Sequence, residues 1–196
     1  MRGFHTNLAS CRQFEGDEVR SLLEKAGKFK LNTFLMEYNE RFPFESHPAI
    51  SSCNAFTRED VRSFEKICEE NAIEIIPEID LPGHMMAALA AYPELGCTGG
   101  PYEVWPRWGI SDEVLCAGND KIFDLLEGVF EEIVEMFPSE LIHIGGDECP
   151  KTRWSTCPTC QAKIKELGLK DDDKHSAEHY LQSYVMTRIE EFLAEK

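Results

Sequence analysis

Apolar and polar residues follow one another in blocks that predict a repeated order of strand and then helix. Runs of strand length occupy residues 2–9, 31–39, 73–80 and 141–146. The segments 16–30, 57–72, 119–137 and 177–196 instead carry apolar residues at helical spacing, and a short helix ending near Gly168 is expected in addition. The chain is therefore predicted to contain four strand-then-helix units.

The four helical segments each present one apolar face that we expect to be buried. Thr57 is expected to cap the second segment, with Asp60 three residues further on. The residues assigned to the buried faces are, in chain order, Val19, Leu22, Leu23, Ala26, Phe29, Val61, Phe64, Ile67, Cys68, Ile122, Leu126, Val129, Ile133, Phe137, Tyr180, Tyr184, Ile189 and Leu193.

This alternation favours a parallel sheet covered by helices, in either a doubly wound fold or a (β/α)8 barrel. Barrel enzymes assemble their sites from the carboxyl ends of several strands, whereas doubly wound folds commonly bind ligands beside one Gly-rich phosphate loop. Neither GxGxxG nor GxxxxGK[ST] occurs in the chain. Polar residues follow three of the four strands, namely Glu37, Glu40, Asp80, His84, Asp147 and Glu148. The barrel is therefore preferred, and residues 1–196 are expected to be one partial domain holding about the first four of its units.

Composition narrows the classes of partner. Twenty basic and thirty-six acidic side chains give a formal charge of −16, which disfavours nucleic acid and anionic membranes as partners. The apolar runs are too short to cross a bilayer, and the first residues lack the apolar run of a signal peptide. We expect a soluble chain whose compartment the sequence leaves open.

The sequence "HIGGDE", residues 143–148, carries the clearest chemistry. Its two glycines permit a sharp turn at a strand end, and the adjacent carboxylates of Asp147 and Glu148 point in different directions. Such a pair can divide acid catalysis from charge stabilisation. The alternative is a polar turn in which Asp147 caps the next segment and Glu148 is solvated. His143 is expected to be a buried group that orients its neighbours.

Asp80 and His84 flank a Pro-Gly turn after the preceding strand. At that position they could form a relay from a carboxylate through histidine to the catalytic pair. A metal site built from Asp80, His84, Asp147 and Glu148, as in a metal-dependent barrel hydrolase, is the second enzymatic interpretation.

Eight cysteines are spread over a chain long enough to have its own core, so most are expected to be free thiols. The pairs of interest are Cys97 with Cys116 and Cys157 with Cys160. Cys149 and the Cys157–Cys160 pair form only a three-cysteine local group, while zinc requires four ligands. Structural cysteines or a disulfide are therefore preferred to zinc.

The long segment between Pro93 and Asn119 contains Tyr102, Trp105 and Trp108. Aromatic faces stack on sugar rings, so these residues could line the site where the leaving group binds. Packing of the loop over the rim of the barrel explains the same residues equally well.

Three motifs in this order, "RGF", "IPEIDLPGH" and "HIGGDE", resemble the barrel of the family 20 glycoside hydrolases, the β-N-acetylhexosaminidases. The segments "LAAYPELGCTGGPYEVWPRWGI" and "VLCAGN" are similar to bacterial members, and the resemblance spans nearly the whole chain. It implies hydrolysis of terminal N-acetylhexosamine from oligosaccharides or glycoconjugates. The mechanism it implies is retaining and substrate-assisted, with the 2-acetamido oxygen as nucleophile.

The resemblance also implies roles for individual residues. Arg2 would bind sugar hydroxyls, Asp147 would orient and stabilise the acetamide, and Glu148 would act as general acid and then base. His84 would hydrogen-bond near the acid/base, and His143 would support the pair. Neither a cofactor nor a metal is implied.

The chain also departs from the family pattern. Glu40 occupies roughly the place of an aspartate that ends strand two in many members, within "FLMEYNERFPFES". The family's later strands, which supply pocket tryptophans and a tyrosine that holds the acetamide, have no counterpart in residues 1–196. The third interpretation is therefore a non-catalytic carbohydrate-binding remnant. A half barrel is also expected to self-associate or to need a partner half, and to have little activity alone.

Overall fold

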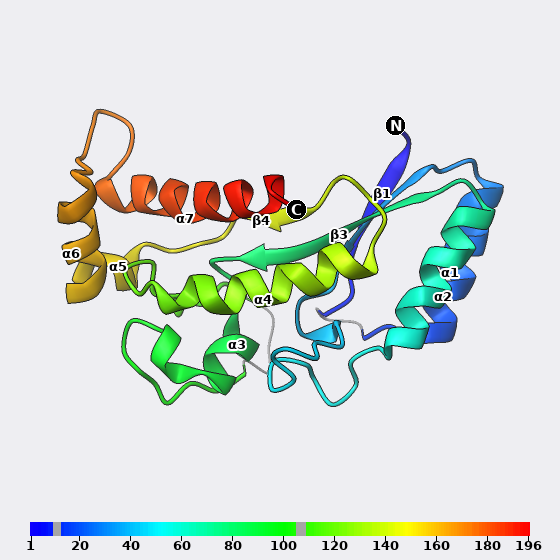
Figure 1. The fold of residues 1–196 in the computed structure, drawn as a ribbon, viewed down its shortest axis with the longest axis horizontal. Helices are drawn as coiled ribbons and strands as arrows, with labels where there is room; N and C mark the ends of the chain where they lie inside the picture. The colour runs from blue at the N-terminus through cyan, green and yellow to red at the C-terminus, as the bar shows by residue number, and fades with distance from the viewer. Residues whose placement is uncertain (10–12, 105–108) are drawn as a thin grey trace. The chain divides into compact units, whose positions relative to one another are not determined.

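The computed structural model describes residues 1–9, 13–104 and 109–196 (Figure 1). Its elements in chain order are β1 (Gly3–Asn7), α1 (Gly16–Lys28), β2 (Thr33–Glu37), η1 (Asn39–Arg41), α2 (Arg58–Glu70), β3 (Glu74–Leu81), α3 (Met86–Ala91), η2 (Pro93–Leu95), α4 (Lys121–Met136), β4 (His143–Gly145), α5 (Thr152–Thr156), α6 (Pro158–Leu167) and α7 (Ala177–Ala194). They belong to two compact units, residues 1–79 with 131–144 and residues 80–130 with 145–196, so β3, α4 and β4 contribute residues to both.

The strands form one sheet in the order β1-β2-β3-β4. β1 pairs with β2, and β2 pairs with β3, both in parallel, and the first ladder begins with Gly3 opposite Thr33. In a doubly wound sheet the order of the strands reverses at a switch point, whereas strands that follow one another in a barrel are neighbours. The unreversed order, with a helix after each strand, confirms the partial (β/α)8 barrel predicted from the sequence.

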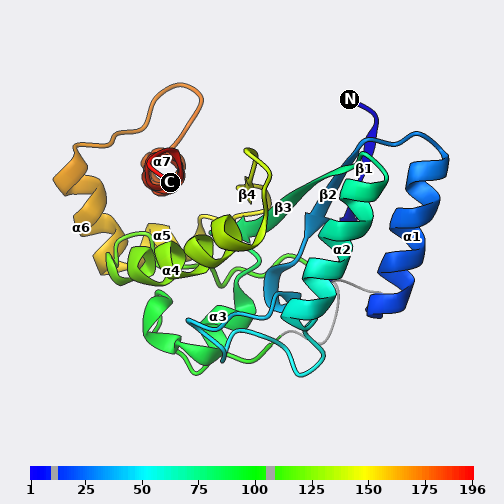
Figure 2. The same ribbon diagram turned by 45° about the vertical axis from the view of Figure 1, so that its right-hand side comes forward.

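In the first unit, α1 and α2 lie side by side in both views (Figure 2). The predicted capping box of α2 is present, because Thr57 Oγ1 accepts from the Asp60 N–H at 3.0 Å and the Asp60 carboxylate accepts from the Thr57 N–H. Such a cap contributes about 1 kcal/mol. The helices bury Val19, Leu23, Ala26, Val61, Phe64 and Cys68.

Three residues that were assigned to the buried faces of these two helices are not buried. Leu22 and Ile67 are half-buried. Phe29 is 78% exposed, because α1 ends at Lys28 and the chain turns at Phe29 as its C-cap. The apolar face predicted for α1 therefore ends one turn earlier than its sequence pattern suggests.

The five residues assigned to the buried face of α4 are all buried, which confirms that stripe. On α7 the assignment was wrong in part, because the buried stripe is Ala177, Leu181, Val185 and Ile189. Tyr180, Tyr184 and Leu193 are half-buried instead. The Tyr180 hydroxyl donates to the Asp172 carboxylate at 2.5 Å, and a ring with a polar tip is well placed at a helix edge. In the described part of the chain, every helix is too short or too polar to cross a membrane.

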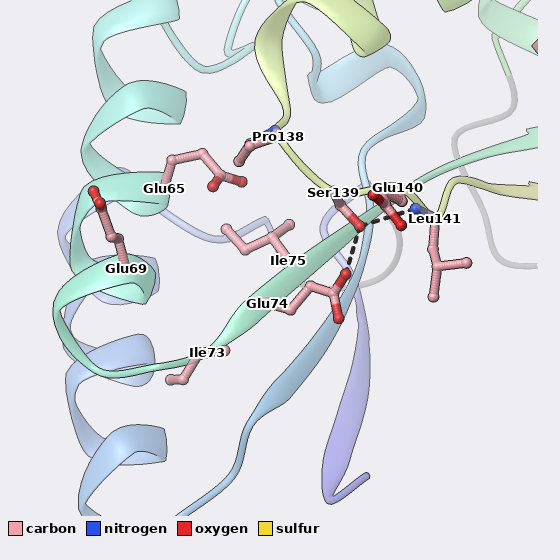
Figure 3. A pocket seen from close by; sticks show the side chains of 9 residues that line it. All are labelled: Glu65, Glu69, Ile73, Glu74, Ile75, Pro138, Ser139, Glu140 and Leu141. Atoms are coloured by element: carbon pink, nitrogen blue, oxygen red, sulfur yellow. Dashed lines mark hydrogen bonds between the residues drawn. The ribbon is translucent and has the colours of Figure 1, made fainter. Parts of the chain in front are cut away.

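A pocket of about 500 Å³ lies at the amino end of β3, within the first unit (Figure 3). Its lining includes Glu65 and Glu69 of α2, Glu74 and Ile75 of β3, and Ser139, whose hydroxyl donates to Glu74 at 2.9 Å. Barrel enzymes place their chemistry at the carboxyl ends of the strands, whereas the amino ends contribute to stability. We therefore interpret this pocket as a feature that affects the stability of the unit and not as its catalytic site.

Glu65→Gln is expected to raise stability at pH 8 and to change it much less at pH 5. Burial raises the pKa of Glu65 from 4.5 to about 7, and Glu69 adds to the shift. The folded chain therefore binds a proton that the unfolded chain has lost, so the stability present below pH 4.5 is lost as the pH rises through 7. The gain at pH 8 should be roughly 1 to 3 kcal/mol.

Chemical denaturation of both proteins from pH 5 to pH 8 measures this effect. Glu70→Gln is the matched control, because Glu70 is exposed at the end of the same helix. Parallel pH profiles for the parent chain and Glu65→Gln would contradict the assignment.

Candidate active site

The second unit contains a sharp turn where β4 ends. Gly145 and Gly146 have φ of +68° and +108°, in the region that favours glycine. A side chain at Gly145 would be impossible, because its Cβ would lie 1.8 Å from Asp80 Oδ1. The Gly146 N–H donates to the same Asp80 oxygen at 3.2 Å. The predicted glycine turn is therefore present, and it brings the chain after β4 against the end of β3.

Glu148, His84 and Asp80 form a continuous chain of contacts. His84 Nε2 lies 3.1 Å from Glu148 Oε2 and 3.7 Å from Asp80 Oδ2. The Asp80 side chain is 6% exposed, that of His84 29% and that of Glu148 43%. Both carboxylates approach the same ring nitrogen, with that of Glu148 nearer and more accessible and that of Asp80 farther away and buried. An accessible carboxylate held by a histidine is suited to exchange protons with a bound ligand.

His84 and Glu148 both have positive φ, at +52° and +43°. Non-glycine residues are uncommon in this region, and such strain is concentrated at active sites and ligand clamps. Gly83 permits the close approach of the two turns, because a Cβ there would lie 3.1 Å from the Glu148 carbonyl oxygen. The backbone is thus shaped to bring these two side chains together.

Asp147 is exposed and directly precedes Glu148. Its neighbourhood is held by two residues that sequence reasoning did not identify. The Gln182 side chain on α7 donates to the Gly146 carbonyl at 2.5 Å and accepts from Lys151 Nζ at 2.5 Å. Because Gln182 lies 36 positions from Gly146, no local pattern indicated this contact.

Other predicted site residues belong to the first unit. Arg2 was expected to bind sugar together with the residues at the carboxyl ends of the strands, but it directly precedes β1, where its backbone N–H donates to Asn32 Oδ1 at 2.7 Å. That expectation was wrong, because the ladder of β1 begins at the next residue. Glu40 lies in η1 after β2, and burial raises its pKa.

His143 was expected to be buried, but its side chain is 48% exposed. The reason is its position on β4, a three-residue strand at the edge of the sheet. Its Nδ1 lies 2.7 Å from the buried carboxylate of Glu78, which also lies 3.0 Å from His5 Nε2. Glu78 therefore joins two strand-borne histidines that the sequence did not connect.

Trp105 and Trp108 lie outside the described residues. Tyr102, from the same segment, is half-buried, and its hydroxyl accepts from the Thr98 N–H at 3.1 Å. The side chain of Tyr102 also packs against Gly96, where a Cβ would lie 2.1 Å from the Tyr102 oxygen. Tyr102 therefore holds its own loop together.

Two groups of potential metal ligands occur in the described part of the chain. One is His5 with Glu37 and Glu78, and the other is Cys97 with Cys116, Cys157 and Cys160. Neither group includes Asp147 or Glu148. Cys149 is buried separately, and its burial raises the pKa of its thiol to about 11.

Residues 2–196 match the family described as glycosyl hydrolase family 20, catalytic domain. A beta-hexosaminidase of Porphyromonas gingivalis is 36% identical over 98% of this chain and 26% of that protein. The solved structure of Flavobacterium johnsoniae chitobiase matches 99% of this chain and 30% of its own, with 30% identity and a TM-score of 0.88. A beta-N-acetylhexosaminidase of Bacteroides fragilis matches 99% of this chain and 39% of its own, with 28% identity and a TM-score of 0.82. This chain therefore spans about a quarter to two fifths of the relatives named here.

Proposed function

The chain belongs to glycosyl hydrolase family 20, and from this we propose that it supplies the catalytic pair of an enzyme that removes terminal, non-reducing N-acetyl-β-hexosamine residues. The observation that carries the proposal is the contact chain from Asp80 through His84 to Glu148, beside a strained glycine turn. The relatives named beta-hexosaminidase support the substrate class.

In this proposal Glu148 is the general acid. It protonates the glycosidic oxygen as the bond between that oxygen and the anomeric carbon breaks. His84 holds the carboxyl group in place, and Asp80 orients the histidine. The partial exposure of Glu148 supports this role, because the acid must reach the substrate and later accept a proton from water.

The nucleophile is the carbonyl oxygen of the substrate's own 2-acetamido group, which forms a bond to the anomeric carbon as the leaving group departs. The cyclic intermediate carries positive charge on the acetamide nitrogen, and the ionised Asp147 stabilises it. Water then attacks the anomeric carbon and loses a proton to Glu148. The ring opens, and the product keeps the configuration of the substrate.

We assign residues 1–196 to the first four β/α units of a single barrel domain. Glu40 binds sugar hydroxyls in this proposal, and His143 supports the site. β1 and β4 are the edges of the four-stranded sheet. Because unpaired strand edges favour association, the same chain self-associates or pairs with a second half barrel.

A segment graft tests the function directly. Residues 2–196 replace the matching segment of the Porphyromonas gingivalis beta-hexosaminidase, which is 36% identical to this chain. The graft is expected to release 4-nitrophenol from its N-acetyl-β-glucosaminide, with kcat/KM within about tenfold of the host, because both segments would present the same catalytic groups. Circular dichroism confirms that the graft is folded.

The control is the same graft with both Asp147→Asn and Glu148→Gln, which should be folded and nearly inactive. A folded graft whose activity equals that of this double variant would contradict the proposal and favour a non-catalytic carbohydrate-binding role. Activity that depends on added divalent metal after exhaustive dialysis would favour the metal-dependent hydrolase instead.

A further inference from the structure

Four thiols of the second unit converge on one point. The sulfur atoms of Cys97, Cys116, Cys157 and Cys160 all lie within 4.8 Å of one another. Cys97 is half-buried and the other three are buried. All four are free thiols.

Three chain segments bring these cysteines together. An isolated antiparallel bridge joins Gly96 to Leu115, the residues that precede Cys97 and Cys116, and the Cys116 N–H donates to the Leu95 carbonyl at 2.8 Å. The second pair frames the start of α6, where Cys157 is the N-cap and Cys160 lies in the first turn. The Trp154 indole N–H donates to the Leu115 carbonyl at 2.9 Å and fixes α5 beside the bridge.

The distances between the sulfur atoms suit a tetrahedral metal ion. Cys97 lies 3.8 Å from Cys160, and Cys116 lies 3.7 Å from Cys157 and 3.6 Å from Cys160. Zinc–sulfur bonds of about 2.3 Å in a tetrahedron require sulfur atoms about 3.8 Å apart. A disulfide requires about 2.05 Å, so each pair would have to close substantially to form one.

The backbone beside the cluster is closely packed and favours negative charge on the sulfur atoms. Gly118 lies against the backbone of Thr159 and Cys160 in the first turn of α6. Only glycine fits at this position, because a Cβ would lie 2.4 Å from the Thr159 carbonyl oxygen. The amino end of α6 adds the positive end of a helix dipole, which stabilises thiolates.

We propose that Cys97, Cys116, Cys157 and Cys160 bind one zinc ion as a structural site. Zinc displaces the four thiol protons, so that binding releases four protons and produces a tetrathiolate complex. Four protein ligands leave no open position for water or substrate, which distinguishes a structural site from a catalytic one. The ion ties the bridge between Gly96 and Leu115 to α5 and α6.

The test is the metal content of the 196-residue chain, purified with a non-thiol reductant and without a chelator. Elemental analysis by mass spectrometry should find one zinc ion per chain. Cys116→Ser and Cys160→Ser should reduce this to near none. Cys149→Ser is the matched control and should retain the zinc, because Cys149 is a buried cysteine of the same unit outside the cluster.

Two further measurements on the parent chain do not depend on how the variants fold. A thiol-specific mercurial should release the zinc as it titrates these cysteines, and replacement by Co²⁺ should give the absorption bands of tetrahedral cobalt thiolate. The proposal is overturned by a folded parent chain that contains iron, by one that binds no zinc when zinc is added, or by two disulfides joining the four cysteines under reducing conditions. Loss of zinc in Cys149→Ser to the same extent as in Cys116→Ser would also overturn it.

Discussion

Glu148→Gln in the grafted hexosaminidase is expected to lower turnover of substrates with alcohol leaving groups by about 10²- to 10⁴-fold. A sugar or alkyl alkoxide leaves slowly unless it is protonated, and the amide of glutamine cannot deliver a proton. Turnover of the 4-nitrophenyl glycoside should fall much less, because that leaving group is stable as an anion. The measurement is kcat/KM on chitobiose and on the 4-nitrophenyl substrate, together with inhibition by N-acetylglucosamine.

Inhibition by the product sugar should be nearly unchanged in this variant, since the glutamine side chain is similar in size to the glutamate that it replaces. Glu140→Gln serves as the control, because Glu140 is exposed and precedes β4. If Glu148→Gln reduced the turnover of both substrates by the same factor, Glu148 would not be the general acid.

Asp147→Asn is expected to slow both substrates, by about 10²- to 10³-fold, the typical cost of losing one group that stabilises charge in the transition state. Its carboxylate is needed when the acetamide becomes positively charged, and this happens in the step that releases either leaving group. Asparagine keeps the shape of the side chain but carries no charge. The measurement is again kcat/KM on the two substrates.

The two variants should therefore differ in their dependence on the leaving group. Asp120→Asn is a suitable control for Asp147→Asn, because Asp120 is an exposed carboxylate of the same unit that contacts Lys163. A rate for Asp147→Asn that is normal on the 4-nitrophenyl substrate and low on chitobiose would assign the acid role to Asp147 and contradict the division proposed here.

The features that sequence patterns predicted well are local. The α4 stripe of Ile122, Leu126, Val129, Ile133 and Phe137 is buried as expected, because successive turns of that helix repeat the same apolar spacing. Errors occurred where an element ends or where a side chain combines an apolar ring with a polar hydroxyl group. Phe29 lies beyond the last turn of α1, and Tyr180 has a hydroxyl that reaches Asp172.

The candidate site shows the same division between local and distant information. Two glycines followed by two carboxylates indicated a turn with catalytic groups, because the backbone freedom of glycine is a property of single residues. The contact of His84 with Glu148 was suggested by the shared placement of both residues after strands and by the family resemblance. Gln182, Lys151 and Glu78 were not identified, because their partners are distant in the chain or lie on other strands.

The cysteines show most clearly where a pattern along the chain stops being informative. Spacing identified Cys97 with Cys116 and Cys157 with Cys160 as pairs, and it counted three local ligands near the second pair, one fewer than zinc requires. Folding instead joins the two pairs and leaves Cys149 outside the cluster, since a bridge between Gly96 and Leu115 carries the first pair to the start of α6, 63 positions away in the case of Cys97 and Cys160. Periodicity and turn chemistry act over a few residues and so can be detected in the order of residues. Convergence of distant side chains depends on packing of whole elements, which becomes visible in the folded chain.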